Sequence, residues 1–119
     1  MSANTSATDA VPDRPVPLDS EADLDAFIAA HDRVLVEFYT AGCGLCASIE
    51  PVIGNVARAH DDLAVATINP REDPPLVDRF RITSVPTLVR FDEGEAVDRL
   101  ASGFQGGDAI DEFLAAPTA

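Results

Sequence analysis

The sequence predicts an α/β fold in which a central mixed sheet of four or five strands is covered by helices on both faces. Three observations lead to this prediction. Apolar runs of strand length alternate with segments whose apolar residues recur at helical spacing. Two strand-like segments near the carboxyl end are separated by a short polar turn, which favours an antiparallel pair. The 119 residues, 46% of them hydrophobic, fit one domain with a substantial core.

We divide the chain into a disordered tail over residues 1–17 and one domain over residues 18–119. The tail is rich in Ser, Thr, Ala, Pro and Asp and has no apolar periodicity. A short edge strand near Val16–Leu18 is the weaker alternative for its last residues. The tail also lacks the basic segment and apolar stretch of a secretory signal, so we expect a cytoplasmic protein.

The first half of the domain is predicted to be helix, strand and helix. Ser20 can cap a helix that ends near His31. Residues 34–39 form an almost continuous apolar run, which is typical of a central strand buried on both faces. After a turn, a second helix is expected over residues 43–60, with a kink at Pro51 because proline lacks the N–H that a helix needs.

The second half is predicted to contain three strands and two helices. Residues 63–68 are an apolar strand, and a short helix is expected over residues 76–80, after two prolines. The strands over 87–91 and 96–101 form the hairpin, and a last helix follows residues 106–108. The resulting order α-β-α-β-α-β-β-α indicates a mixed sheet with helices on both faces.

The charge of the chain is strongly negative. Acidic residues number 21 and basic residues 8, all of them Arg, which gives a net charge of −13. Such a surface repels nucleic acid and anionic membranes, so we expect neither as a partner. Asp outnumbers Glu by 14 to 7, and Lys is absent, which resembles haloarchaeal proteins. We interpret the composition as an adaptation to high salt, where screening weakens self-repulsion.

The motif that carries chemistry is Cys43-Gly44-Leu45-Cys46, at the point where an apolar strand gives way to a helix. A helix N-terminus stabilises a thiolate, so the pKa of Cys43 should be lowered. Cys46 lies almost one turn further on, within reach of a disulfide bond. We expect Cys43 to attack a substrate disulfide and Cys46, the more buried cysteine, to resolve the mixed disulfide.

Other interpretations of the two cysteines remain open at this point. A structural disulfide would close too small a loop to stabilise the fold much. Two sulfurs supply only half of a zinc or iron–sulfur site, so a metal-binding module would need further ligands or a second protomer. Two inert buried cysteines are the third alternative.

Two separate segments carry a family resemblance. Residues 36–46, with Pro51 after them, resemble the active-site strand and helix of thioredoxins, and residues 82–88 resemble their cis-proline segment. The likeness extends over about residues 20–116. It implies the thioredoxin fold and a thiol–disulfide oxidoreductase that reduces protein disulfides. It also implies a thioredoxin reductase as electron donor, a monomer, and no cofactor or metal besides the Cys43–Cys46 pair.

The resemblance also assigns roles to individual residues. It implies a cis peptide bond at Pro86 and a substrate segment that pairs with the main chain of Val85. Gly103 and Phe104 resemble the loop that forms another wall of the substrate groove. Around the cysteines, the expected substrate contacts are Gly42, Gly44 and Leu45.

Glu37 stands where thioredoxins usually have a buried Asp. Inside an apolar strand its pKa should rise, which suits a base that takes the proton of Cys46. The alternative is a strand Glu that faces solvent. The family's nearby Lys is replaced by Thr67, so that charge partner is missing. We interpret Arg71 and Glu72, in the loop after the 63–68 strand, as solvated charges.

The motif departs from the family pattern at two positions. Gly42 replaces the usual Trp, and Leu45 replaces the usual Pro. Proline at the position of Leu45, just before the second cysteine, favours a strongly reducing pair. We therefore expect a less reducing protein than a typical thioredoxin. A disulfide oxidase or isomerase is therefore a second alternative beside the metal-binding module.

Overall fold

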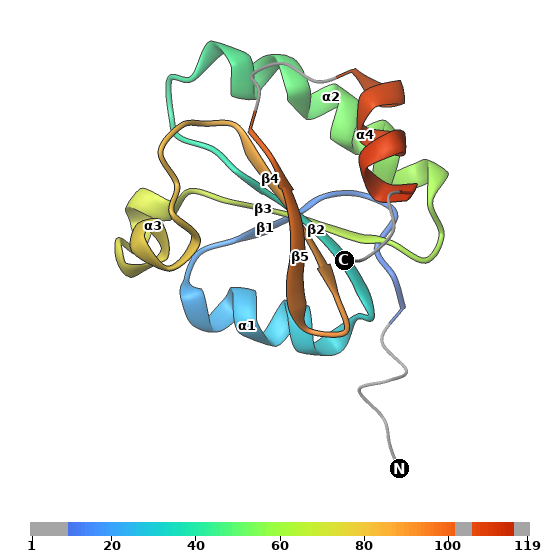
Figure 1. Cartoon of the computed structure of the whole chain (residues 1–119), viewed down its shortest axis with the longest axis horizontal. Helices are drawn as coiled ribbons and strands as arrows, with labels where there is room; N and C mark the ends of the chain where they lie inside the picture. The colour runs from blue at the N-terminus through green and yellow to red at the C-terminus, as the bar shows by residue number, and fades with distance from the viewer. Residues whose placement is uncertain (1–9, 102–105, 116–119) are drawn as a thin grey trace.

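The computed structural model describes residues 10–101 and 106–115. One five-stranded sheet forms the centre of the molecule, and helices lie above and below it (Figure 1). The elements in chain order are β1 (Val16–Leu18), α1 (Glu21–Ala30), β2 (Arg33–Phe38), α2 (Gly44–Ala59), β3 (Ala64–Ile68), the 3-10 helix η3 (Pro70–Glu72), α3 (Pro75–Phe80), β4 (Thr87–Asp92), β5 (Glu95–Leu100) and α4 (Gly107–Ala115).

The sheet has the strand order β1-β3-β2-β4-β5. Strands β1, β3 and β2 run parallel, whereas β4 is antiparallel to β2 and β5 is antiparallel to β4. Strand β2 therefore lies in the middle, between β3 and β4, and its last five residues are buried. This position explains its almost continuous apolar sequence, because both of its faces are covered.

The two faces of the sheet carry separate halves of the core. On one face, α1 and α3 cover the strands through Leu24, Ile28 and Leu76. On the other face, α2 and α4 lie side by side, with Ile49, Ile53, Ile110 and their neighbours over the sheet (Figure 1). Alternate residues of β2 point to opposite faces, so Leu35 belongs to the α2–α4 half and its neighbours in the strand to the other half.

The predicted α/β class and the order of the elements after the tail are confirmed. Ser20 caps α1, accepting a hydrogen bond from the N–H of Asp23 at 3.1 Å. The boundary after Pro17 needs correction, because Val16 and Pro17 belong to β1, which pairs with β3. The alternative of a short edge strand near Val16–Leu18 is the one that the structure confirms. Its sequence signal is weak because it has only three residues and its partner strand is far away in sequence. The prediction for residues 1–9 lies outside the described residues.

Two arginines hold the carboxyl end of α4 on the sheet. The buried guanidinium of Arg90 donates to the carbonyls of Phe113 and Leu114, at 3.3 and 2.9 Å. Arg33 donates to the same Leu114 carbonyl at 3.3 Å and to Asp62 at 2.8 Å. The last carbonyls of a helix lack partners inside the helix, and cations are favourable there. These contacts hold the end of α4 against the sheet, so we assign both arginines a structural role.

Candidate active site

The two cysteines lie at the N-terminus of α2 and form a disulfide. Their Cα atoms are 5.2 Å apart, and Cys43 is the N-cap of the helix. The Cys43 Sγ accepts a hydrogen bond from the N–H of Cys46 at 3.1 Å. The same N–H would stabilise a Cys43 thiolate after reduction, together with the positive end of the helix dipole.

Exposure distinguishes the two sulfur-bearing residues. Cys46 is 2% exposed, whereas Cys43 is only partly buried. A protein disulfide approaching from solvent can therefore reach Cys43, whereas Cys46 is almost inaccessible from solvent. The sequence-based expectation that Cys46 is the more buried cysteine is confirmed.

The turn before Cys43 explains one departure from the family pattern. Gly42 has φ +79°, a left-handed conformation in which residues with a Cβ are strained. The N–H of Cys43 closes the turn by donating to the carbonyl of Thr40 at 3.4 Å. The aromatic residue usual in the family would be strained in this backbone conformation, so Gly42 and the shape of the turn belong together.

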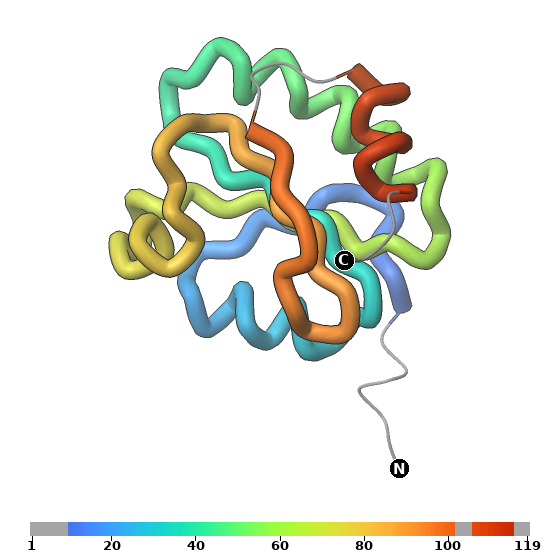
Figure 2. Tube along the Cα trace, in the orientation of Figure 1, coloured from blue at the N-terminus to red at the C-terminus, as the bar shows by residue number. Residues whose placement is uncertain are grey.

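The cis-proline segment lies against the disulfide. The Val85–Pro86 peptide bond is cis, as the resemblance implied, and the carbonyl oxygen of Val85 is 3.9 Å from the Cys43 Sγ. Figure 2 shows the loop before β4 running beside the turn between β2 and α2. Thr87 anchors this loop by donating its hydroxyl hydrogen to the carbonyl of Ser84 at 2.6 Å.

Glu37 is buried in β2, so the solvent-facing alternative is wrong. Its side chain is 1% exposed and shares the α2 face of the sheet with Leu35, by the alternation of the strand. Burial, with a smaller contribution from the negative charge of Glu50, raises the pKa of Glu37 to about 7. Within the described residues, one of its carboxylate oxygens has no hydrogen-bond partner.

The remaining predicted groove residues divide into two groups. Gly42, Gly44 and Leu45 are exposed around the disulfide, and Leu45 is the one large hydrophobic side chain that the described segments leave exposed, at 48%. This apolar exposure lies directly between the two cysteines. Gly103 and Phe104 lie outside the described residues.

Sequence reasoning missed a hollow beside Cys43. It has a volume of about 230 Å³ and is lined by Val85 and Thr40, together with Arg71, Thr83 and Ser84 and several apolar side chains. Its residues come from four separate stretches of the chain. The one signal in the sequence was the position of Arg71 shortly after β3. The end of β3 pairs with the end of β2, which leads into the cysteine motif.

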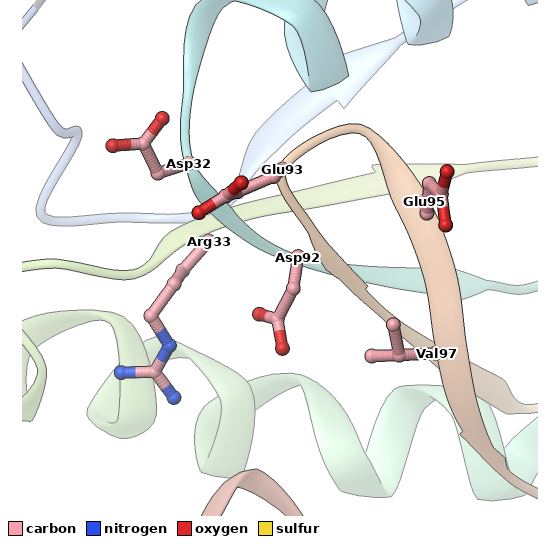
Figure 3. A pocket seen from close by; sticks show the side chains of 6 residues that line it. All are labelled: Asp32, Arg33, Asp92, Glu93, Glu95 and Val97. Atoms are coloured by element: carbon pink, nitrogen blue, oxygen red, sulfur yellow. The ribbon is translucent and has the colours of Figure 1, made fainter. Parts of the chain in front are cut away.

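A second hollow lies away from the disulfide. The carboxylates of Asp32, Asp92, Glu93 and Glu95 line it, with Arg33 among them (Figure 3). Arg33 begins β2, whereas the cysteines follow the other end of that strand. Across residues 10–101 and 106–115, no group of three or more His, Cys, Asp or Glu side chains is arranged to hold a metal ion. In the same residues, no helix is both long and apolar enough to cross a membrane.

A cysteine pair at a helix N-terminus, with the main chain before a cis-proline against its more exposed member, is typical of the class of thiol–disulfide oxidoreductases. Comparison with known proteins identifies the family. The family model described as thioredoxin matches residues 16–116. A thioredoxin from Alicyclobacillus acidocaldarius is 36% identical over 97 residues, which cover 81% of this chain and 91% of that protein.

Solved structures agree with this result. A point mutant of the thioredoxin from Halobacterium salinarum NRC-1 superimposes with a TM-score of 0.84 at 35% identity, covering 93% of this chain and 96% of that one. The oxidised thioredoxin from Plasmodium falciparum shares the fold, with a TM-score of 0.77 at 23% identity, over 88% of this chain and 99% of its own. The chain belongs to the thioredoxin family and is a thiol–disulfide oxidoreductase.

Proposed function

We propose that this protein reduces the disulfides of other proteins, with Cys43 as nucleophile and Cys46 as resolving cysteine. The Cys43 thiolate attacks one sulfur of the substrate disulfide, and the other sulfur leaves as a thiolate. Cys46 then attacks the Cys43 sulfur and releases the second substrate thiol. Two electrons pass to the substrate, and the Cys43–Cys46 disulfide forms. The observation that carries this proposal is the unequal exposure of the two cysteines.

Glu37 is proposed to accept the proton of Cys46 during resolution. A base works best when its pKa lies near the working pH, and the pKa of about 7 meets that condition. Its burial on the α2 face supports the role, because Cys46 and the apolar stripe of α2 face the same side of the sheet. The longer arm of Glu relative to Asp carries the carboxyl group further from the strand.

The substrate is proposed to bind as an extended segment along the main chain of Val85. The Val85 carbonyl lies 3.9 Å from the Cys43 Sγ, so a strand paired there brings its own cysteine to the attacking sulfur. Leu45 supplies exposed apolar surface next to this position. Gly42, Gly44, Gly103 and Phe104 complete the proposed groove.

The family places this activity in a cycle with a thioredoxin reductase, which we propose as the electron donor. We further propose a monomer that works in the cytoplasm, needs no cofactor besides its own disulfide, and binds neither nucleic acid nor membranes. The test of the activity is the reduction of insulin disulfides by the pre-reduced protein, followed through precipitation of the freed chains. Insulin that stays intact in the presence of the fully reduced protein would contradict the proposal.

The reduction potential is expected to be less negative than the value of about −270 mV typical of thioredoxin. Leu45 occupies the position of the family's proline, and its backbone is less restricted at the start of α2. Equilibration with glutathione or a reference thioredoxin measures the potential, and Leu45→Pro is the matched variant, expected to move it to a more negative value. A wild-type potential at or below that of the reference would overturn this expectation. A much higher potential would favour the alternative of an oxidase or isomerase.

Adaptation to high salt is proposed from the charge and composition. A net charge of −13 without any Lys, and a similar structure from Halobacterium salinarum, support it. Because salt screens self-repulsion, the free energy of unfolding should rise clearly between about 0.1 M and about 2 M KCl. Urea unfolding followed by circular dichroism at several KCl concentrations measures this change. Equal stability at both ends of the range would contradict the proposal.

A further inference from the structure

The hollow adjoins Cys43, the more exposed of the two cysteines, through two of its lining residues. Val85, which lines it, has its carbonyl 3.9 Å from the Cys43 Sγ. Thr40 also lines it, and the Thr40 carbonyl accepts a hydrogen bond from the N–H of Cys43 at 3.4 Å. A peptide that places its cysteine on Cys43 therefore brings a neighbouring side chain to the opening. The volume of about 230 Å³ is below that of pockets for small-molecule ligands and fits a single side chain.

The lining combines apolar residues, polar residues and one positive charge. Val77, Ile82 and Pro70 supply apolar surface, and Thr83 and Ser84 supply hydroxyl groups. Arg71 supplies the one charge, and no acidic residue lines the hollow. The chain has 21 acidic residues, yet the lining of this hollow next to Cys43 carries a positive charge and no negative one.

The Arg71 side chain has no structural partner in the described residues, unlike most arginines of this chain. Arg33, Arg79, Arg90 and Arg99 are all engaged with carboxylates or main-chain carbonyls. Arg71 is exposed, and its guanidinium takes part in none of the hydrogen bonds or ion pairs found within residues 10–101 and 106–115.

The backbone that carries Arg71 is held in place. The N–H of Arg71 donates to the Asn69 side chain at 3.0 Å, and the next two N–H groups donate to the carbonyls of Asn69 and Pro70 at 3.0 and 3.2 Å. A fixed Cα with a free guanidinium is suited to bind a carboxylate at low cost in backbone entropy. The adjacent Glu72 lies outside the lining, and the Asp73 carboxylate accepts the N–H of Glu21 at 2.8 Å.

From these observations we propose that the hollow binds the side chain next to the target cysteine and that Arg71 makes it prefer an acidic one. Glu suits this lining, since its methylene groups match the apolar residues and its carboxylate is complementary to Arg71 and to the hydroxyl groups of Thr83 and Ser84. The proposal rests on the proposed reduction of protein disulfides and names the class of substrate that is reduced fastest. Arg71 acts as a specificity-determining residue and takes no part in the electron transfer.

The test uses short peptides whose single cysteine carries a coloured aromatic thiol as a mixed disulfide. Three peptides differ only in the residue next to cysteine, which is Glu, Gln or Lys, and a second set varies the residue on the other side. The second-order rate constant of the pre-reduced protein is measured by release of the coloured thiol. For exposed charge pairs we expect the Glu peptide of one set to react about two- to fivefold faster than its Gln peptide, and the Lys peptide more slowly.

Substitutions at Arg71 test whether its charge causes the preference for the Glu peptide. Arg71→Gln should bring the Glu and Gln peptides to the same rate, and Arg71→Glu should favour the Lys peptide. Arg81→Gln is the matched control, because Arg81 is also exposed and unpartnered in the described residues but lines a different hollow. It should keep the wild-type ratio. The ratio should also fall as KCl is raised.

Two results would overturn the inference. One is an unchanged Glu-to-Gln ratio in Arg71→Gln, and the other is an equal loss of the ratio in Arg81→Gln, which would indicate general electrostatics. If the wild type reduces none of the peptides, including those with Gln, the proposed reductase activity fails instead. The rate for the Gln peptide therefore separates the two failures.

Discussion

Replacing Cys43 by serine is expected to lower the rate of insulin disulfide reduction by at least about 10³-fold, to the rate of the added reductant alone. The hydroxyl group of serine is not ionised at neutral pH and does not attack a disulfide. Cys46 cannot replace Cys43 because it is 2% exposed. The measurement is insulin reduction with dithiothreitol as electron donor. Undiminished activity of Cys43→Ser would remove the proposed nucleophile.

The matched control is Cys46→Ser, which should behave differently. This variant keeps the partly exposed Cys43 and should form a mixed disulfide with the substrate that is not resolved from within the protein. Mass spectrometry detects the adduct. Both variants lose the same disulfide, so a difference between them reports the roles of the cysteines and not the stability of the fold. An adduct on Cys43→Ser and none on Cys46→Ser would reverse the assignment.

Glu37→Gln is expected to gain stability relative to the wild type as the pH rises. Folding raises the pKa of Glu37 from 4.5 to about 7, so the folded state keeps a proton that the unfolded state has already released. Wild-type stability therefore falls across this range and levels off above it. The difference in unfolding free energy should move by about 3 kcal/mol in favour of Glu37→Gln between about pH 4.5 and about pH 8.

Urea unfolding of both oxidised proteins at one KCl concentration measures this difference. Comparing the two curves cancels the titration of all other groups and the constant cost of burying an amide. Glu50→Gln is the control, because it removes the smaller cause of the raised Glu37 pKa. In this variant the loss of stability with rising pH should end at a lower pH than in the wild type. Parallel stability curves for Glu37→Gln and the wild type would show that Glu37 does not titrate in this range.

The same variant tests the proposed role of Glu37 as a base. A glutamine cannot accept a proton, so resolution by Cys46 should slow by about 10²-fold, in the range of general base catalysis. Stopped-flow measurement of the mixed disulfide separates this step from the attack by Cys43, which should be unaffected. Resolution at the wild-type rate would remove the proton transfer from the proposal while leaving the stability effect intact.

Local sequence patterns were sufficient to predict most of the fold. The helices and strands follow from apolar periodicity and short-range signals such as the Ser20 cap, which act between residues close in sequence. The 3-10 helix at Pro70–Glu72 was missed, and β1 was foreseen only as the weaker alternative for the end of the tail. Both have three residues, too few for a periodic pattern, and β1 depends on pairing with β3.

The active site divides in the same way. The positions of Cys43 and Cys46 at a helix start depend on four consecutive residues, so the sequence by itself located the reactive pair. Together with the family resemblance of residues 82–88, it also predicted the chemistry. Tertiary structure alone decided that Glu37 faces the interior below α2, that the Val85 carbonyl lies beside Cys43 from 42 residues away, and that Arg71 borders the same hollow. Each of these depends on which face of a strand is covered and on how loops from separate segments meet. Those contacts form only when the whole sheet and its helices are packed.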